Sequence, residues 1–558
     1  MRRWVVYPNG HVTLNDHSAI VRLAGVQKQP QVLNRSKQMR SLKIWAVCTI
    51  SLALGSFTAV ISEETCSRTE DPPALPAALQ YLEEHKDEAQ QDVLDLVTIP
   101  SISSMSDYTE HVREAGQWLV RRLRKAGLEN AQMLRTNGLP AVFAQWTNAA
   151  PGAPTVLIYG HYDVQPIYVN HFVQWTHKPF QPAIEDGDFI GRGVDDNKGN
   201  LLIAVQAVEA FLKTGELPVN VKFLFEAEEE TGSANLAQLV RQKRKLLAAD
   251  LALSTDGGQV SESQGGIPVS MRGRVSFEIE AETATHDAHS GFFGGSVPNA
   301  LHVLVGLLSS LHAPNGSIAV EGFYDGVREI DEEDRHDVSI FPLDEESEAV
   351  RLGLEAHTGE EGYSTLERRW LRPSLEIVGV VGGHTGEGMR GVITSKAKAK
   401  VMGRLVANQN ATAVLESLKH HISAQTPRHA RVSFRPVAQQ GRLVTEPYRI
   451  AKDTLGNRAA AKVLEEVMGS KPLWYMEGHS VACFNYFREY LGILTTQFGF
   501  GVPDYQAQSE MDGALRNDER LPLSSFHKGR RAWVMLLHEI AKLSGTTSSI
   551  APSCSALD

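Results

Sequence analysis

The sequence predicts an α/β fold in which a mainly parallel sheet carries helices on both faces and is interrupted by an inserted α+β domain. Three observations support this prediction. Strand and helix patterns alternate between residues 78 and 264, the pattern changes after about Gly265, and the alternation returns near Tyr448. Such alternation is typical of parallel sheets, because each crossover between parallel strands needs a helix. At 558 residues the chain is too long for one compact core, so more than one domain is expected.

The first part of the chain supplies four helices and four strands. Apolar residues recur at helical spacing in Ala78–Leu96, Val112–Ala126, Leu201–Leu212 and Ala234–Arg241. Short apolar runs predict strands at Ala141–Trp146, Thr155–Tyr159, Val219–Glu226 and Leu251–Ser254. Gly127 is expected to end the second helix.

The segment after Gly265 has a different character. It contains, in order, a strand at Val269–Ala284, a helix near Val297–Leu311, an acidic segment at Tyr324–Ser364, strands at Leu375–Val381 and Ala397–Leu405, and a helix at Ala411–Ile422. The strand–helix pattern then continues from Tyr448 through Ala459–Val467 and Gly492–Gln497 to a helix around Ser525–Leu543. These changes predict an N-terminal extension (1–77), a first α/β part (78–264), an insert (265–447), a second α/β part (448–545) and a polar tail (546–558).

The N-terminal extension contains an uncharged stretch of 18 residues, Ile44–Ile61. Counted from Met39, it has the basic start, apolar run and small residues near Ser56–Ala59 of a secretory signal. Counted from the first residue it lies too deep for a normal signal, so the first 38 residues would reflect an overlong start. The run is also just long enough to span a bilayer. The expectation is an exported, periplasmic or membrane-anchored protein, with a cytoplasmic location as the alternative.

Composition argues against two classes of protein. The formal net charge of −11 argues against nucleic acid as the main partner, because phosphate binding needs a basic face. The four cysteines, Cys48, Cys66, Cys483 and Cys554, are scattered along the chain. Their spacing fits neither a zinc ribbon nor a disulfide framework.

The most informative motif is GHYDVQP at Gly160–Pro166, which directly follows a predicted strand. In open α/β sheets, ligands bind at the carboxyl ends of the strands. His161 at such a position can bind a metal, and Asp163, two residues later, can orient it. Taken alone, His161 is more often a structural histidine with satisfied hydrogen bonds.

Three further motifs bring acidic residues to comparable positions. They are GRGVDDNKGN (Gly191–Asn200), EAEEETGS (Glu226–Ser233) and LALSTDGG (Leu251–Gly258), in which Asp256 closes a strand. Each motif alone is more often a surface turn or a solvated acidic loop. Together they predict that four successive strand ends each deliver an acid or a histidine to one edge of the sheet.

Clustered carboxylates repel one another and are costly to bury without a counter-charge. One divalent cation, or two, would resolve this conflict. Nitrogen and carboxylate ligands without cysteine suit Zn²⁺, Mn²⁺ or Co²⁺.

These motifs resemble those of the two-metal aminoacylase/carboxypeptidase peptidases, and most closely the branch of cytosolic nonspecific dipeptidases and carnosinases. The resemblance covers about Ala78–Leu543. It implies that the two α/β parts form a catalytic domain and that the insert is a lid and dimerisation domain. It also implies two divalent metal ions, Zn or Mn, a small peptide substrate and a homodimer.

The resemblance assigns one role to each of six residues. In chain order they are His161 as ligand of one metal, Asp163 as orienting carboxylate, Asp196 as bridge between both metals, Glu229 as general base, Glu230 as ligand of the second metal and Asp256 as ligand of the first. The bridging role goes to Asp196 rather than to Asp195.

Three motifs outside the first α/β part also match. DAHSGFFGGSVPN resembles the lid signature, which implies that His289 stabilises the oxyanion in the partner subunit's site. GRLVANQ resembles the segment whose arginine, here Arg404, holds the substrate carboxylate, and GHSVA resembles a substrate loop that contains Ser480. Without the resemblance, His289 would be interpreted as a helix-capping or turn histidine, Arg404 as a surface arginine at a strand end, and Ser480 as part of a plain turn.

One ligand of the family is missing. Its last ligand is a histidine in a segment shaped like GLGLPD…HSPNE, whereas this chain has GFGVPDYQAQSEMDGALRNDER. Alignment from the left puts Gln508 at that position, and alignment from the right puts Ala514 or Leu515 there. A glutamine oxygen is a weak ligand for zinc. His479, which replaces a usual glycine in GHSVA, is either the missing imidazole or a bystander loop residue.

The sequence therefore predicts a metal-dependent hydrolase that cleaves dipeptide-like amide bonds near a free carboxylate by a metal-activated water. One alternative is an N-acyl amino acid amidohydrolase that uses the same centre. The other is a non-catalytic homologue, a dimeric binding or scaffold protein that lost one metal ligand, although the intact Glu229 and Glu230 argue against it.

Overall fold

The computed structural model describes residues 74–167, 175, 177–438, 443–502 and 518–547, together with three short strands near the N-terminus. The chain separates into two compact units, Met1–Arg68 and Thr69–Asp558. The first unit holds an antiparallel sheet of β1 (Trp4–Val6), β2 (His11–Leu14) and β3 (Val21–Arg22). The segment Ile44–Ile61 lies outside the described residues, so its signal or anchor role stays a prediction. In the described part of the chain, no helix combines the length and apolar character needed to cross a membrane.

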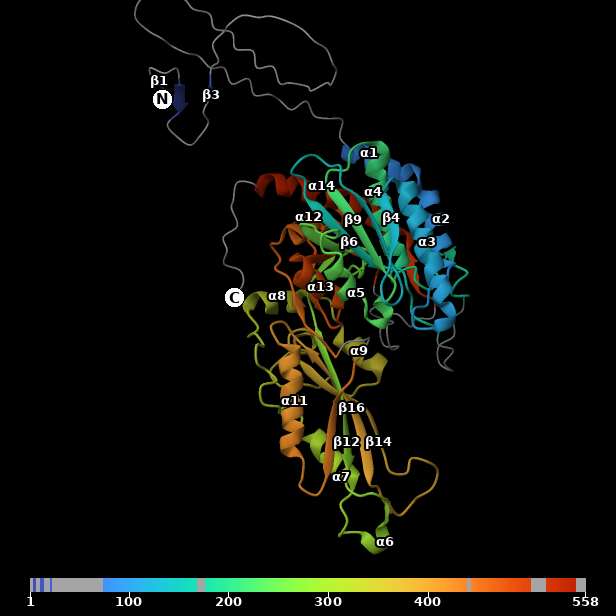
Figure 1. Cartoon of the computed structure of the whole chain (residues 1–558), viewed down its shortest axis with the longest axis vertical. Coiled ribbons are helices and arrows are strands. Elements are labelled where there is room, and N and C mark those ends of the chain that lie inside the picture. The colour runs from blue at the N-terminus through green and yellow to red at the C-terminus, as the bar shows by residue number, and fades with distance from the viewer. Residues whose placement is uncertain are drawn as a thin grey trace, which may run out of the picture. The chain divides into compact units, whose positions relative to one another are not determined.

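A six-stranded sheet forms the centre of the second unit (Figure 1). Its spatial order is β21 (Thr495–Gln497), β10 (Leu251–Ser254), β6 (Thr155–His161), β9 (Asn220–Glu226), β5 (Ala141–Trp146) and β4 (Glu129–Leu134). The four strands from β21 to β9 are parallel, whereas β5 and β4 each pair antiparallel with their neighbour. The sheet is therefore mainly parallel, as predicted, and β6 continues two residues beyond its predicted end to include His161.

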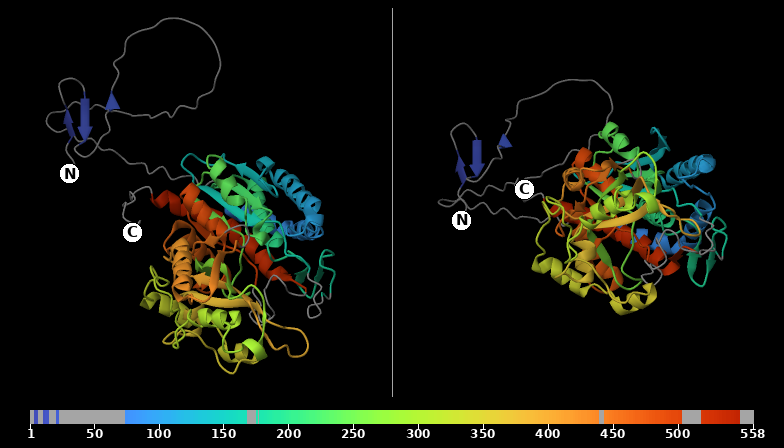
Figure 2. Two further views of the ribbon diagram at one scale, coloured as in Figure 1. Left: turned by 60° about the horizontal axis from the view of Figure 1, so that its bottom comes forward. Right: turned by 90° about the horizontal axis from the view of Figure 1, so that it is seen from below.

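Alternating strand residues pack against helices on opposite faces of this sheet. Val156 and Ile158 of β6 belong to a core that includes α1 (Ala74–Glu84), α2 (Lys86–Val97), α3 (Thr109–Ala126), α4 (Lys198–Thr214), α12 (Leu455–Met468) and α14 (Leu523–Thr547). Leu157 and Tyr159 belong to a second core with α5 (Leu236–Gln242), α8 (Glu332–Ile340), α10 (Thr365–Trp370) and α13 (Ala482–Leu491). The long helix α14, in red, is visible in both views of Figure 2 and packs along α4 and α12. Helices cover both faces, which confirms the prediction.

Two smaller sheets belong to the same unit. One consists of β19 (Tyr448–Arg449), β11 (Gly266–Met271) and β20 (Leu473–Glu477), and the other of β22 (Arg520–Pro522), β8 (Asp188–Ile190) and β7 (Ala183–Glu185). Each joins segments that are far apart in the sequence, which is why neither sheet could be recognised from local patterns.

We use the name lid for the part of the insert that is built on a separate antiparallel sheet. The order of this sheet is β14 (Ser374–Gly382), β16 (Lys396–Leu405), β12 (Gly273–Glu282) and β17 (Arg431–Pro436). A further short strand, β18 (Val444–Thr445), also pairs with β12. Helices α7 (Ala300–Ser309) and α11 (Ala411–Gln425) cover one face through a separate apolar core (Figure 1). The remaining lid elements are β13 (Ala288–His289), α6 (Ser290–Phe293), α9 (Glu345–Leu352) and β15 (Val392–Ile393). The domain boundaries inferred from the sequence stay predictions.

Two predicted elements are divided in the structure. The single helix expected at Ala78–Leu96 is interrupted at His85, which has non-helical dihedral angles and separates α1 from α2. The single strand expected at Val269–Ala284 is two strands, β11 and β12, in different sheets. The break falls at Arg272, and β12 begins at Gly273, where an added Cβ would lie 2.7 Å from the carbonyl oxygen of Thr445. This close approach to a distant segment leaves no local signal in the sequence.

Candidate metal centre

Three strand ends and one turn bring together an imidazole and several carboxylates. His161 is the last residue of β6, Glu229 and Glu230 lie in the short 3₁₀ turn after β9, and Asp256 follows β10. Asp196 instead comes from the turn between β8 and α4. The prediction that four strand ends of the central sheet supply these groups was therefore wrong for Asp196, because β8 belongs to a different sheet.

His161, Asp196 and Glu230 form the core of this cluster, since one ligand atom of each lies within 4.8 Å of the other two. His161 is fully buried, and its Nδ1 lies 3.1 Å from the carbonyl oxygen of Asp163. A carbonyl oxygen can only accept, so Nδ1 is the donor. The other ring nitrogen, Nε2, then faces Asp196 Oδ1 at 2.8 Å, which is the arrangement of a metal-binding histidine held by a backbone carbonyl.

Three of the clustered carboxylates, those of Glu229, Glu230 and Asp256, resist ionisation. Burial, together with the charges of Asp196 and Glu229, raises the pKa of Glu230 well above its usual range. Burial also raises the pKa of Glu229 to about 8 and that of Asp256 to about 6, and neighbouring carboxylates contribute in both cases. Burial opposes ionisation of His161 as well, but hydrogen bonds to Asp163 and Asp196 raise its pKa. One imidazole with four acidic groups, and no thiol among the described residues of the cluster, is a donor set that fits a divalent cation.

Asp163 orients the cluster through the backbone. Its carboxylate is fully buried and accepts hydrogen bonds from the backbone N–H groups of Glu229 (3.3 Å) and Glu230 (3.2 Å). It therefore fixes the 3₁₀ turn that carries both glutamates, as well as lying next to the ring of His161.

Sequence reasoning missed two residues that hold the cluster. Glu519 Oε1 accepts hydrogen bonds from the backbone N–H groups of Asp195 (2.9 Å) and Asp196 (3.0 Å), and Oε2 accepts one from Gly193 (2.7 Å). Gln165 Nε2 donates to Glu230 Oε2 at 2.7 Å. The NDER run around Glu519 and the GHYDVQP motif around Gln165 were noticed, but nothing in them indicates these long-range contacts.

The close packing behind His161 requires a glycine before it. A Cβ added at Gly160 would lie 2.4 Å from Thr255 Oγ1 and 2.9 Å from Asn197 Oδ1. These two side chains are themselves hydrogen-bonded at 2.9 Å. This hydrogen bond crosses the backbone of β6 and joins the end of β10 to the turn that carries Asp196.

His479 lies beside the cluster but is not one of its three core residues. Its Nε2 is 2.8 Å from Glu477 Oε2, and the side chain is 57% exposed. Desolvation lowers its pKa, but the charges of Glu477, Asp256 and Glu229 outweigh this and raise it to about 9. Gln508, the other candidate for the missing ligand, lies outside the described residues.

The two residues predicted to bind a substrate carboxylate are brought together. Arg404, at the end of β16, donates from Nη1 to Ser480 Oγ at 3.1 Å. Ser480 directly follows His479 in the sequence, so Arg404 contacts the loop that borders the acidic cluster.

His289 is the N-cap residue of α6, a helix that lies at the tip of the lid in Figure 1. It is exposed, its Nδ1 accepts a hydrogen bond from the backbone N–H of Gly291 at 3.0 Å, and its ring contacts Phe292. Both contacts are with neighbouring residues at the tip of the lid, and neither is with a residue of the acidic cluster.

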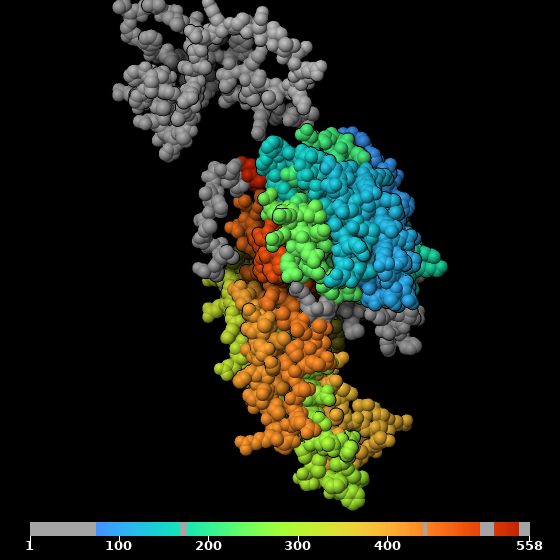
Figure 3. All heavy atoms as spheres, in the orientation of Figure 1, coloured from blue at the N-terminus to red at the C-terminus, as the bar shows by residue number. Residues whose placement is uncertain are grey.

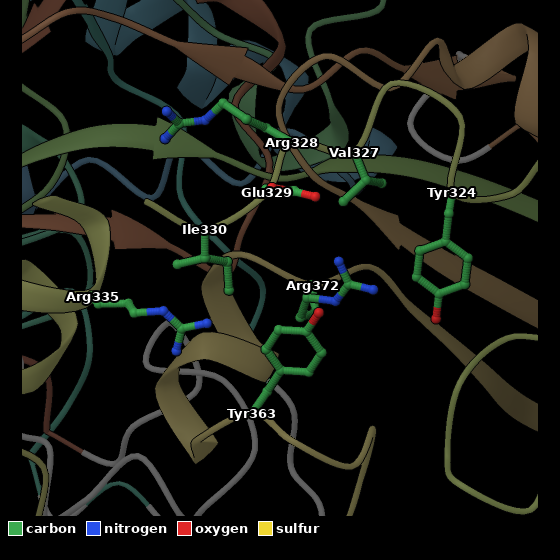
Figure 4. Close-up of a pocket in the computed structure, with 8 residues that line it drawn as sticks. All are labelled: Tyr324, Val327, Arg328, Glu329, Ile330, Arg335, Tyr363 and Arg372. Carbon is green, nitrogen blue, oxygen red and sulfur yellow. The ribbon is translucent and has the colours of Figure 1, made fainter. Parts of the chain in front are cut away.

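A separate cavity of about 380 Å³ is lined by residues between Tyr324 and Arg372, around α8 and α10 (Figure 4). It is lined by Tyr324, Val327, Arg328, Glu329, Ile330, Arg335, Tyr363 and Arg372. Its arginines are paired with carboxylates, and Arg372 in addition packs against the rings of Tyr324 and Tyr363. None of the lining residues belongs to the acidic cluster.

The profile of peptidase family M20/M25/M40 matches residues 157–539, which is more than half of the chain and includes every residue of the cluster. The chain belongs to this family. The predicted resemblance is thereby confirmed.

Relatives of known activity match over nearly their whole length. The Cys-Gly metallodipeptidase of Schizosaccharomyces pombe is 29% identical over 493 residues, which cover 84% of this chain and 99% of the relative. The human Beta-Ala-His dipeptidase is 28% identical over 492 residues, which cover 85% of this chain and 94% of the relative. The solved structure of a metallo-carboxypeptidase of this family from Sulfolobus solfataricus has a TM-score of 0.71 at 27% identity and covers 82% of this chain and all of that one. The chain is a metallopeptidase that binds divalent metal, and its α/β fold is that of the family.

Proposed function

We propose that this M20 peptidase hydrolyses dipeptides at a centre of two divalent metal ions. The observation that carries the proposal is the approach of the ligand atoms of His161, Asp196 and Glu230 to within 4.8 Å of one another, with the half-buried Glu229 next to Glu230 in the chain. The dipeptidase names of the curated relatives support the substrate class.

Four residues are assigned as ligands. His161 and Asp256 would hold one ion, Glu230 would hold the other, and Asp196 would be shared by both. The hydrogen bonds of Asp163 support its role as the residue that orients this set. Nitrogen and carboxylate donors favour Zn²⁺ or Mn²⁺.

Glu229 is the general base in this proposal. Bound divalent ions polarise a substrate carbonyl and lower the pKa of water from about 15.7 to near 7. Glu229 takes the proton of the attacking water and then donates it to the leaving amine. Burial raises the pKa of Glu229, which makes its protonated form accessible for the second transfer.

Arg404 and Ser480 bind the C-terminal carboxylate of the substrate. A guanidinium can form two parallel hydrogen bonds with a carboxylate, which fixes both its position and its direction. The hydrogen bond from Arg404 to Ser480 supports a shared role, since both side chains then face the same space. His289 stabilises the tetrahedral oxyanion from the partner subunit, a role that agrees with its exposed position at the tip of the lid.

The lid offers an apolar surface for a homodimer. β14 is the edge strand of the lid sheet, and its Val378, Val380 and Val381 are 55%, 53% and 60% exposed. The gold atoms of this segment lie on the surface in Figure 3. An exposed apolar edge strand is a typical site of pairing with a second chain.

We expect the wild-type chain to be a dimer in light scattering, and Val380→Asp to be a monomer with reduced activity, because it would lack the partner's His289. Val350→Asp is the matched control, since Val350 is 77% exposed but lies on α9. A wild-type protein that is monomeric at micromolar concentration would contradict the dimer.

His479 is proposed to supply the missing imidazole at the second metal, with Gln508 as the weaker alternative. The charges of Asp256 and Glu229 act on its ring, so His479 lies within electrostatic reach of the cluster. His479→Ala should then retain one ion where the wild type retains two, as measured by elemental analysis after removal of excess metal. Unchanged metal content would exclude His479 as a ligand, and Gln508→Ala measured in parallel tests the alternative.

Hydrolysis of neutral dipeptides with added Mn²⁺ or Zn²⁺ tests the proposed function. We expect turnover that a chelator abolishes and that either ion restores. Cleavage of N-acetyl amino acids with dipeptides left intact would favour the N-acyl amino acid amidohydrolase instead. Absence of turnover on both substrate classes would contradict the proposal.

A further inference from the structure

A row of polar residues crosses one face of the lid sheet at the end that carries Arg404. Arg404 lies directly opposite Arg274 of β12 on one side and Ser374 of β14 on the other, and Arg274 lies opposite Thr445 of β18. Directly opposed residues of antiparallel strands share a face, and their Cβ atoms are about 4.5–5.5 Å apart. Two arginine side chains therefore leave the sheet side by side.

Charged residues elsewhere on the same strands are matched in sign. Glu280 lies opposite Lys398, and Glu282 lies opposite both Lys396 and Arg431. These pairs form ion pairs at 3.2 to 3.6 Å. Like charges directly opposite each other destabilise a sheet, so the Arg274–Arg404 pair departs from the rule that the rest of the sheet follows. Departures of this kind are expected at functional sites.

The arginine pair lies at the substrate side of the proposed centre. Arg404 donates to Ser480, on the loop that contains His479. Burial and the charge of Arg404 lower the pKa of Arg274 to about 10, while the charge of Glu229 acts in the opposite direction. Arg274 is therefore within electrostatic reach of both Arg404 and the proposed general base.

One guanidinium is sufficient to bind one carboxylate. A second guanidinium next to it matches a second carboxylate on the same substrate residue. We propose that Arg274 is a specificity-determining residue that binds an acidic side chain at the C-terminus of the substrate, so that the enzyme prefers dipeptides ending in Glu or Asp. This inference rests on the proposed binding of the α-carboxylate by Arg404.

The test compares kcat/KM for Ala-Glu with that for its neutral isostere Ala-Gln, in the wild type and in Arg274→Gln. The wild type should prefer Ala-Glu by about tenfold or more, as expected for a charge-assisted hydrogen bond. In Arg274→Gln, kcat/KM should fall for Ala-Glu but not for Ala-Gln, so that the preference is lost. Arg274→Lys should retain part of the preference. The control Arg435→Gln, at a residue of the same sheet that is paired with Glu278, should retain all of it. An equal loss on both peptides, or a wild type without preference, would overturn the proposal.

Calorimetric binding of free glutamate and glutamine separates this inference from the proposed function. If no dipeptide is hydrolysed but glutamate binds more tightly than glutamine, and Arg274→Gln removes the difference, the specificity role stands and the dipeptidase assignment fails. If dipeptides are hydrolysed and neither measurement distinguishes the acidic from the neutral ligand, Arg274 has no such role.

Discussion

Replacing Glu229 with glutamine is expected to lower kcat for dipeptide hydrolysis by about 10²- to 10⁴-fold, the range typical of a lost general base. Glu229 is half-buried, and desolvation together with the charges of Asp256, Asp196 and Asp163 raises its pKa to about 8. The amide of glutamine has nearly the same shape but cannot accept the proton of the attacking water. The metal content should stay at the wild-type value, because Glu230 rather than Glu229 is the proposed ligand.

Glu228→Gln is the matched control for this variant. Glu228 is the preceding carboxylate in the sequence, but it accepts hydrogen bonds from the backbone of Leu139 and from Asn235, away from the cluster. We expect near wild-type turnover from it. A Glu229→Gln enzyme with the wild-type rate, or one that loses metal together with activity, would exclude Glu229 as the base.

The second large effect is expected at Asp196. Asp196→Asn should weaken metal binding by more than about 100-fold, which exceeds the 10- to 100-fold loss typical of residues that only orient a ligand. The reason is that its Oδ1 lies 2.8 Å from His161 Nε2 at the centre of the cluster. Removing this carboxylate takes a donor from both proposed ions, so activity should fall with metal content.

The neighbouring Asp195 provides the comparison. Its carboxylate accepts a hydrogen bond from Asn200 at 3.3 Å and is not part of the three-residue core. Asp195→Asn should therefore retain most of its metal. If elemental analysis showed the reverse order of metal loss in these two variants, the bridging role would belong to Asp195.

Local patterns in the sequence predicted the parts of the centre that local structure determines. His161 ends the buried strand β6 and Asp256 follows the buried strand β10, and the apolar runs of both strands were visible in the sequence. The bounds of β5 and β10 agree with the predicted strands for the same reason. The order of the motifs along the chain then indicated the family to which these strand ends belong.

Long-range contacts decided the features that the sequence did not predict. The turn that presents Asp196 is held by Glu519, more than 300 residues away in the chain. The pairing of Arg274 with Arg404 depends on the register of two strands separated by most of the lid. Neither contact leaves a periodic signal in the sequence, and the antiparallel direction of β5 likewise depends on its partner β9.

The most direct test is elemental analysis of the wild-type protein after saturation with Mn²⁺ or Zn²⁺ and removal of excess ions. The proposed centre requires about two ions per chain, released when the pH falls low enough to protonate His161 and the carboxylates. A protein that retained no divalent ion under these conditions would contradict the central claim that this cluster is a metal site.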